Sequence, residues 1–251
     1  MLNDAILAED YKRMNMEQVA EKHGVSLTTV FRHLQSMNIP TIKSSIKTVE
    51  FTKIHQEVIT GSLLGDGSLC MPKNSKSAFF RIEHSIKQAA YLQYKYLLIE
   101  QLCKLAPRGN STRIAMTTAN HPALTDIYRQ WYPESKKIVP FGEIEKHLTP
   151  LGLAIWYLDD GGIRNHGISG SIATASFTFD EVEQLADFLL NKYNIHASVH
   201  SDRNYPRLYI PGKGHFIPNK GWENSTSEFV KFTALIRPYI PSSMLYKLGK
   251  A

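Results

Sequence analysis

Cysteine is scarce in this chain of 251 residues, since only Cys70 and Cys103 are present. Two cysteines without the short spacing of metal-binding pairs exclude a disulfide framework and a cysteine-based metal site, and they favour a reducing compartment. Long apolar runs are also absent, which excludes a membrane-spanning helix. The opening residues have no basic segment ahead of an apolar one, so we expect no signal peptide. We therefore expect a soluble, non-secreted protein of the cytoplasm (a phage or bacterial nucleoid) or of an organelle.

Acidic residues are outnumbered by basic ones, 23 against 29, which gives a net charge of +6. Residues 1–45 hold five basic and five acidic residues, so the remainder carries the whole excess, 24 against 18. A basic excess favours a polyanionic partner such as nucleic acid. An excess of this size is common among soluble proteins, so it does not identify the partner by itself.

Residues 1–45 have the pattern of a small three-helix unit. We expect helices at 4–14, 16–23 and 27–37, with a turn at His23–Ser26 in which Gly24 breaks the pattern and Ser26 caps the third helix. This pattern is typical of a helix-turn-helix motif and predicts a DNA-binding module. The alternative is a plain three-helix cap with no role in nucleic-acid binding. The expected core residues are Val19, Ala20, Val25, Val30 and Leu34, the outward residues of the recognition helix are Thr28, Thr29, Arg32 and His33, and Thr41–Glu50 is a predicted linker.

One short motif occurs twice in the rest of the chain. It reads Ile-Thr-Gly-Ser-Leu-Leu-Gly-Asp-Gly at 59–67 and Leu-Ala-Ile-Trp-Tyr-Leu-Asp-Asp-Gly at 153–161. Both copies are typical of an apolar helix that ends in an acid and a glycine, and the acids Asp66 and Asp160 lie 94 residues apart (160 − 66). Capping-box signals at Ser85–Gln88 and Thr178–Glu181 follow the acids at similar offsets. The duplication predicts a pseudo-twofold fold with one acid from each half at its axis.

Short strands alternate with longer helices from Phe51 onward. Each half therefore predicts a helix, two strands, a helix, two strands and a helix, which is an α+β fold. We place the domain boundaries at 1–45 for the three-helix module and linker start, 46–148 for the first half and 149–251 for the second. The strands we expect are Phe79–His84, Thr112–Thr118, Gly170–Phe177, Ile195–Asp202 and Arg207–Pro211.

With both motifs in one polypeptide, the chain resembles the single-chain LAGLIDADG homing endonucleases. The resemblance covers roughly Phe51–Ala251 and extends to Lys136–Pro140 before the second motif and Ile240–Leu248 at the end. It implies a duplicated αββαββα fold in which two β-saddles track the major groove of double-stranded DNA. It also implies a monomer on a non-palindromic target, because the two halves are not identical.

The family fold requires small side chains where the two motif helices meet. Gly61 and Gly65, four residues apart, provide them in the first helix. The second helix departs from this pattern, because Ala154 is small but Ile155 and Asp159 stand opposite the glycines. We therefore expect a less symmetric helix pair.

The resemblance also implies a metal site at the ends of the two motif helices. Asp66 and Asp160 would be the ligands, with the backbone carbonyls of Gly65 and Asp159 as additional ones. We expect Mg²⁺ as the cofactor, with Mn²⁺ as a substitute and with Ca²⁺ supporting binding without cleavage. Asp159 is the rival for the second acid, but the motif places the residue before the glycine in the site. The alternative is two acids that merely cap helices, and the ten histidines suggest no metal site.

Basic residues complete the implied site. Lys137 and Lys247 match family positions that place a basic side chain near each scissile phosphate, although most lysines are simply solvated. Arginines on or beside the expected strands are candidates for contacts to bases or phosphates. These are Arg81, Arg113, Arg164, Arg203 and Arg207.

The function that follows is site-specific DNA cleavage with a staggered double-strand break in a long asymmetric target. The alternative is binding without cleavage, either by a maturase that acts on its own intron RNA or by a DNA-binding transcription regulator. A metabolic enzyme that handles phosphate at Gly65–Gly67 would explain neither the duplication nor the basic excess.

Overall fold

The computed structural model describes residues 3–12, 14, 16–39, 49–73, 75–164, 168–212, 216–217, 221–222 and 227–249. The chain divides into two compact units, Met1–Glu50 and Phe51–Ala251. Most of the predicted linker, Thr41–Glu50, lies outside the described residues. Among the residues described, none of the helices has the length and apolar character needed to cross a bilayer.

The N-terminal unit consists of helices α1 (Asp4–Tyr11), α2 (Met16–His23) and α3 (Leu27–Ser36), close to the predicted bounds. Gly24 adopts a φ of 63° in the turn before α3, which explains why a glycine stands there. Ser26 caps α3 by accepting a hydrogen bond from the backbone N–H of Thr29 at 3.1 Å. The buried core is formed by Leu7, Val19, Ala20, Val30 and Leu34, and the predicted core residue Val25 is only partly buried against it.

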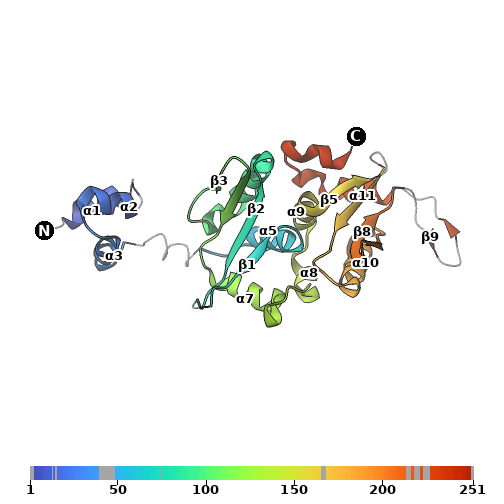
Figure 1. Ribbon diagram of the computed structural model, residues 1–251, viewed down its shortest axis with the longest axis horizontal. Helices are drawn as coiled ribbons and strands as arrows, with labels where there is room; N and C mark the ends of the chain where they lie inside the picture. Colours follow the sequence, from blue (N-terminus) through green and yellow to red (C-terminus); the bar gives the residue numbers. More distant parts are fainter. Residues whose placement is uncertain are drawn as a thin grey trace. The chain divides into compact units, whose positions relative to one another are not determined.

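The first half of the Phe51–Ala251 unit follows the predicted order of elements (Figure 1). The four antiparallel strands of its sheet lie in the order β1-β2-β4-β3. Strand β1 pairs with β2, β3 pairs with β4, and β2 and β4 lie side by side in the middle. Strand β2 alternates buried and accessible residues, so its buried face packs towards the helices. The elements are α5 (Lys53–Leu64), β1 (Ser68–Cys70), β2 (Phe79–Ser85), α6 (Ala89–Ile99), β3 (Arg108–Gly109), β4 (Arg113–Thr117) and α7 (Pro122–Trp131).

The second half repeats that order after a connection through α8 (Phe141–His147). Its sheet has the matching arrangement β5-β6-β8-β7, which confirms the duplicated αββαββα fold. A short antiparallel pair, β9 (Phe216–Ile217) and β10 (Gly221–Trp222), is an addition that the first half does not show among its described residues. The elements are α9 (Pro150–Asp160), β5 (Gly161–Arg164), β6 (Ser169–Ala173), α10 (Phe179–Tyr193), β7 (Ser198–Asp202), β8 (Tyr205–Ile210) and α11 (Glu228–Ile236), followed by a 3₁₀ helix at Ser242–Leu248.

The motif helices α5 and α9 lie side by side between the two sheets (Figure 1). They approach so closely that a Cβ atom added to Gly61 would overlap the backbone of Gly152. The small residue of α9 at this contact is therefore Gly152, and the expectation from the sequence named Ala154 instead. At the other end, a Cβ on Gly65 would meet the side chain of Asp159, so the pair is asymmetric as expected.

The two predicted helix starts differ in the structure. Thr178 forms the predicted capping box with Glu181, and the two side chains bond each other's backbone N–H groups. The prediction for Ser85–Gln88 is wrong, because Ser85 caps only a 3₁₀ turn at Ile86–Gln88. Helix α6 then begins at Ala89, and Gln88 makes no side-chain cap.

Candidate active site

The two motif acids stand at the ends of the central helices. Asp66 follows Gly65, the C-terminal cap of α5, and its side chain is 43% exposed. Asp160 is the last residue of α9 and is half-buried. Burial, followed by the charges of Asp66 and Asp159, raises the pKa of Asp160 to about 7. Burial and the charge of Asp159 also raise the pKa of Asp66. The charge of Asp66 thus acts on Asp160, and the charge of Asp159 acts on both acids.

A lysine accompanies each acid. Lys137 Nζ donates to the carbonyl oxygen of Gly67 at 3.3 Å, and Lys247 Nζ donates to that of Gly161 at 2.9 Å. The two lysines thus occupy matching places, each beside the glycine that follows an acid. Burial lowers the pKa of Lys137 to about 8. Lys247 is held more firmly, because it also donates to the carbonyl of Leu158 at 2.7 Å and so closes the C-terminal end of α9.

The side chain of Asp159 lies inside the protein. Its side chain has no exposed surface, and Lys95 Nζ contacts its Oδ1 at 2.8 Å. The hydroxyl of Tyr91 donates to the same oxygen at 2.7 Å. Lys95 is equally buried, and burial lowers its pKa although Asp159 opposes the shift. The carboxylate of Asp159 is therefore committed to a buried ion pair, which leaves Asp160 as the accessible second acid.

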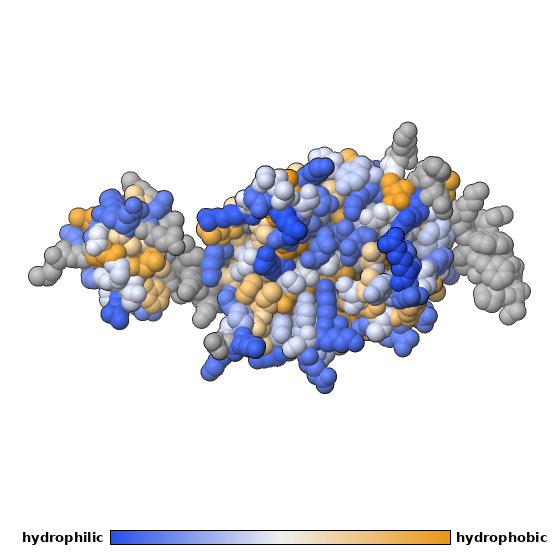
Figure 2. Space-filling view, viewed as in Figure 1, coloured by the Kyte–Doolittle hydropathy of each residue, from blue (hydrophilic) through white to orange (hydrophobic). Residues whose placement is uncertain are grey.

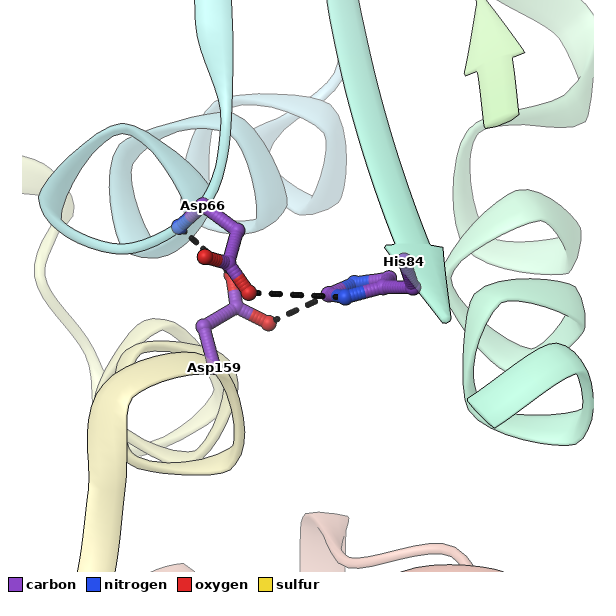
Figure 3. A group of neighbouring side chains, drawn as sticks. All are labelled: Asp66, His84 and Asp159. Atoms are coloured by element: carbon purple, nitrogen blue, oxygen red, sulfur yellow. Dashed lines mark hydrogen bonds and ion pairs between the residues drawn. The ribbon is translucent and has the colours of Figure 1, made fainter. Parts of the chain in front are cut away.

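His84 completes the group of side chains around Asp66 (Figure 3). Its Nδ1 lies 3.4 Å from Oδ2 of Asp66, and its Nε2 lies 3.7 Å from Oδ1 of Asp159. Burial and the charge of Lys95 lower the pKa of His84 to about 4, so the ring is neutral at physiological pH. The sequence suggested no metal site among the histidines and so did not point to His84 beside Asp66 and Asp159. The signal in the sequence was the period-two pattern of β2, which puts His84 on the buried face with Phe80 and Ile82.

The donor atoms at this site suit a divalent cation. Carboxylate oxygens are ligands that Mg²⁺ and Mn²⁺ accept, and a neutral imidazole is also a metal ligand. One ligand atom from each of Asp66, His84 and Asp159 lies within 4.8 Å of the others, although Lys95 already neutralises Asp159. The raised pKa values of Asp66 and Asp160 point the same way, because a cation beside them would relieve the repulsion. The backbone carbonyl of Asp159, a further predicted ligand, lies 3.4 Å from Lys247 Nζ.

Two of the predicted DNA-contacting arginines stand on the first sheet. Arg81 on β2 and Arg113 on β4 are exposed, and both bind the carboxylate of Glu83, at 3.1 and 2.9 Å. On the face of this part that Figure 2 shows, hydrophilic residues lie among pale and hydrophobic ones. Glu83 holds the guanidinium groups in place but also lowers the net charge of this surface.

The other three arginines lie on or beside strands of the second sheet. Arg164 on β5 donates to the hydroxyl of Ser171 at 3.0 Å, and Arg207 on β8 pairs with Asp202 at 2.6 Å. Arg203 is exposed in the turn between β7 and β8. All three arginines line a hollow of about 620 Å³. The structure thus gathers these arginines at one surface of the second half.

The predicted DNA-contacting residues of α3 differ in whether their side chains are already bonded within the N-terminal unit. Thr28 and Arg32 are exposed. The hydroxyl of Thr29 is bonded to that of Ser26 at 2.9 Å, and His33 Nδ1 lies 2.6 Å from the carboxylate of Asp4 in α1. Thr28 and Arg32 are accordingly the better candidates for contacts to a partner.

Comparisons with known proteins agree with this geometry. A model of the LAGLIDADG DNA endonuclease family matches residues 56–215. The chain is 32% identical over 207 residues to the cytochrome b mRNA maturase bI2 of Debaryomyces hansenii, covering 77% of this chain and 72% of the relative. It is 29% identical over 204 residues to the protein RecA of Mycolicibacterium chitae, covering 76% of this chain but less than half of that relative, 45%. Among solved structures, the homing endonuclease I-WcaI bound to its DNA recognition sequence is similar, with a TM-score of 0.69, 26% identity and coverage of 81% and 90%.

Proposed function

Because the chain belongs to the LAGLIDADG DNA endonuclease family, we propose that it is a homing endonuclease that makes a staggered double-strand break in a long asymmetric DNA target by metal-dependent hydrolysis. The observation that carries this proposal is the doubled arrangement of acid, glycine and lysine. Asp66 stands with Gly67 and Lys137 in one half, and Asp160 with Gly161 and Lys247 in the other. Two such sets fit two scissile phosphates, one on each strand.

Each group in the site has a role in this proposal. Asp66 and Asp160 would hold a divalent cation, Mg²⁺ or Mn²⁺, with the carbonyls of Gly65 and Asp159 as additional candidates. When bound, the cation supplies positive charge that acidifies the attacking water and offsets charge on the phosphate. The ammonium groups of Lys137 and Lys247 would add positive charge near each phosphate.

Double-stranded DNA is the partner that the exposed arginines favour. Guanidinium groups suit both phosphates and guanine edges, and arginines stand on both sheets. The similarity to I-WcaI, which is bound to its recognition sequence in the solved structure, supports the same partner. The two halves differ in sequence, so one chain can read a non-palindromic site as a monomer. The three-helix unit would extend the contact through Thr28 and Arg32.

A second candidate function is a role as an RNA maturase for an intron of its own. The observation that favours it is the 32% identity to a relative that is named as an mRNA maturase. A splicing assay with the host intron tests it. Self-splicing that proceeds equally with and without the protein would exclude this role.

A cleavage assay tests the main proposal. The substrate is a supercoiled plasmid that carries the joined DNA on either side of the gene's insertion point, incubated with the full chain and Mg²⁺. We expect linear product from that plasmid and none from a plasmid in which the insertion still interrupts the site. Intact plasmid under all conditions, with binding retained, would favour the maturase or a DNA-binding regulator.

A further inference from the structure

The buried carboxylate of Asp159 connects the two halves of the Phe51–Ala251 unit. Asp159 belongs to α9 of the second half, and both of its short contacts run to α6 of the first half. Lys95 and Tyr91 hold its Oδ1 at 2.8 and 2.7 Å. Neither charged side chain has any exposed surface. A buried ion pair is weak evidence for stability, since apolar residues of similar size often replace one without loss. Its position suggests a different use.

The same carboxylate reaches the site at Asp66. Its Oδ2 accepts a hydrogen bond from the backbone N–H of Asp66 at 3.4 Å. Its Oδ1 lies 3.7 Å from Nε2 of His84, whose other nitrogen lies 3.4 Å from the carboxylate of Asp66. Asp159 therefore contacts both the backbone of Asp66 and the ring beside its side chain (Figure 3).

The first motif has no carboxylate at the position that corresponds to Asp159. The residue that corresponds to Asp159 there is Gly65 (159 − 94). The absence of a side chain at Gly65 makes room for Asp159, because a Cβ atom at that position would lie 2.6 Å from the Cβ of Asp159. The acid of one half thus fills the space that the glycine of the other half leaves open.

His84 also lacks a counterpart among the described residues of the second half. The strand register places Thr174 where His84 lies in the first half, and the hydroxyl of Thr174 donates to the carbonyl of Pro206 at 2.6 Å. At this position the described part of the second half has a threonine hydroxyl and not an imidazole. Ser68 pairs with Arg81 in the first sheet, and the matching Gly162 pairs with Ser171 in the second. His84 lies three positions after Arg81, and Thr174 lies three positions after Ser171.

We propose that Asp159 is a positioning residue for one half of the active site. Lys95 and Tyr91 anchor its carboxylate, which in turn holds the Asp66 backbone and the His84 ring. The two DNA strands are therefore cut by two sets of residues that are not equivalent. The inference rests on the proposed nuclease function. It predicts that loss of Asp159 slows the cut that depends on Asp66 much more than the other cut. It also predicts that DNA binding, which uses the sheets, stays close to the wild-type level.

The experiment compares two double variants that leave no buried charge unpaired. Asp159→Ala with Lys95→Met removes the ion pair and the contacts to Asp66 and His84. Asp159→Asn with Lys95→Met also removes the charges but keeps an amide oxygen that can accept from the Asp66 backbone. The substrate is the duplex from the insertion point with each strand labelled separately, in single-turnover cleavage with Mg²⁺. Melting temperature and binding in Ca²⁺ are measured alongside.

We expect the alanine double variant to cut one strand about 10- to 100-fold more slowly, which is the usual effect of losing a side chain that orients a metal ligand. Nicked DNA should accumulate, and the asparagine double variant should recover part of the rate. Leu124→Ala, which changes a buried residue of α7, is the control that lowers stability and should leave both strand rates unchanged below its melting temperature. Unchanged rates, or an equal fall on both strands, would overturn the proposal.

Tyr91→Phe keeps the experiment decisive if the alanine double variant does not fold. It removes the 2.7 Å hydrogen bond to Asp159 and the longer one, 3.2 Å, to the carbonyl of Ile155. The same strand bias should appear at a smaller size, and the absence of that bias would also overturn the proposal. Wild-type protein that cuts neither strand would instead contradict the nuclease function itself.

Discussion

The contact between the motif helices makes a strong prediction about Gly61. Substitution by alanine adds a Cβ atom that would overlap the carbonyl oxygen, carbonyl carbon and Cα of Gly152. Backbone atoms of a packed helix cannot rotate away as a side chain does, so α5 and α9 must separate. Overpacking of this kind costs about 1–3 kcal/mol, and we take the upper end because the clash is with backbone. The better helix propensity of alanine offsets roughly 1 kcal/mol of that cost.

Gly61→Ala should therefore lower the free energy of unfolding by about 2 kcal/mol, or the melting temperature by roughly 4–8 °C for a unit of this size. Tryptophan fluorescence measures this unit alone, because all three tryptophans (Trp131, Trp156 and Trp222) lie within Phe51–Ala251. A separated helix pair also moves Asp66 away from Asp160. Cleavage should then fall by about 10- to 100-fold, while binding in Ca²⁺ persists.

The matched control is Gly142→Ala in α8, where an added Cβ atom would meet nothing within 4 Å. It should leave cleavage unchanged and raise stability by up to about 1 kcal/mol, as alanine does in an open helical position. If Gly61→Ala melted and cleaved like the wild-type protein, the tight contact between the helices would not position the acids, and our reasoning would fail.

Three further predictions concern pH, metal and the N-terminal unit. The pKa of Lys137 is about 8 in the folded chain against an ordinary 10.5. Between these values the unfolded chain binds more protons, so Lys137 makes stability rise with pH. Lys137→Met should flatten that rise in urea unfolding at pH 8 and pH 10, and an identical rise in both proteins would refute the shift. Cleavage should occur with Mg²⁺ or Mn²⁺ and stop in EDTA, while Ca²⁺ should support binding only; full activity in metal-free EDTA would refute the proposed site. Deletion of residues 1–45 should weaken binding to a long target more than it changes the salt dependence, because that segment has no net charge. A footprint and an affinity unchanged by the deletion would reduce the unit to a stability cap.

The order of elements was readable from the sequence because local patterns set it. Alternating apolar residues gave β2 and β4 within one or two positions. The duplicated motif then fixed the pairing of the two halves. The bounds of the short strands β1, β3 and β5 were not predicted, because strands of two to four residues carry too little periodicity.

The candidate site was only partly readable, because side chains far apart in sequence meet there. The motif pointed to Asp66 and Asp160, and the choice of Asp160 over Asp159 fits the buried ion pair of Asp159 with Lys95. The contacts of Asp159 with Lys95 and His84 join residues 64 or more positions apart (159 − 95), which no local pattern records. The same limit explains why Gly152 was missed at the helix contact.

The central claim is that Asp66 and Asp160 together perform the cleavage. The most direct measurement is cleavage and binding by Asp66→Asn and Asp160→Asn on the duplex from the insertion point. Each substitution removes one negative charge from the pair without changing its volume. We predict that each variant loses double-strand cleavage in Mg²⁺ and still binds the duplex in Ca²⁺ with nearly wild-type affinity. Double-strand cleavage at the wild-type rate by either variant would contradict the claim.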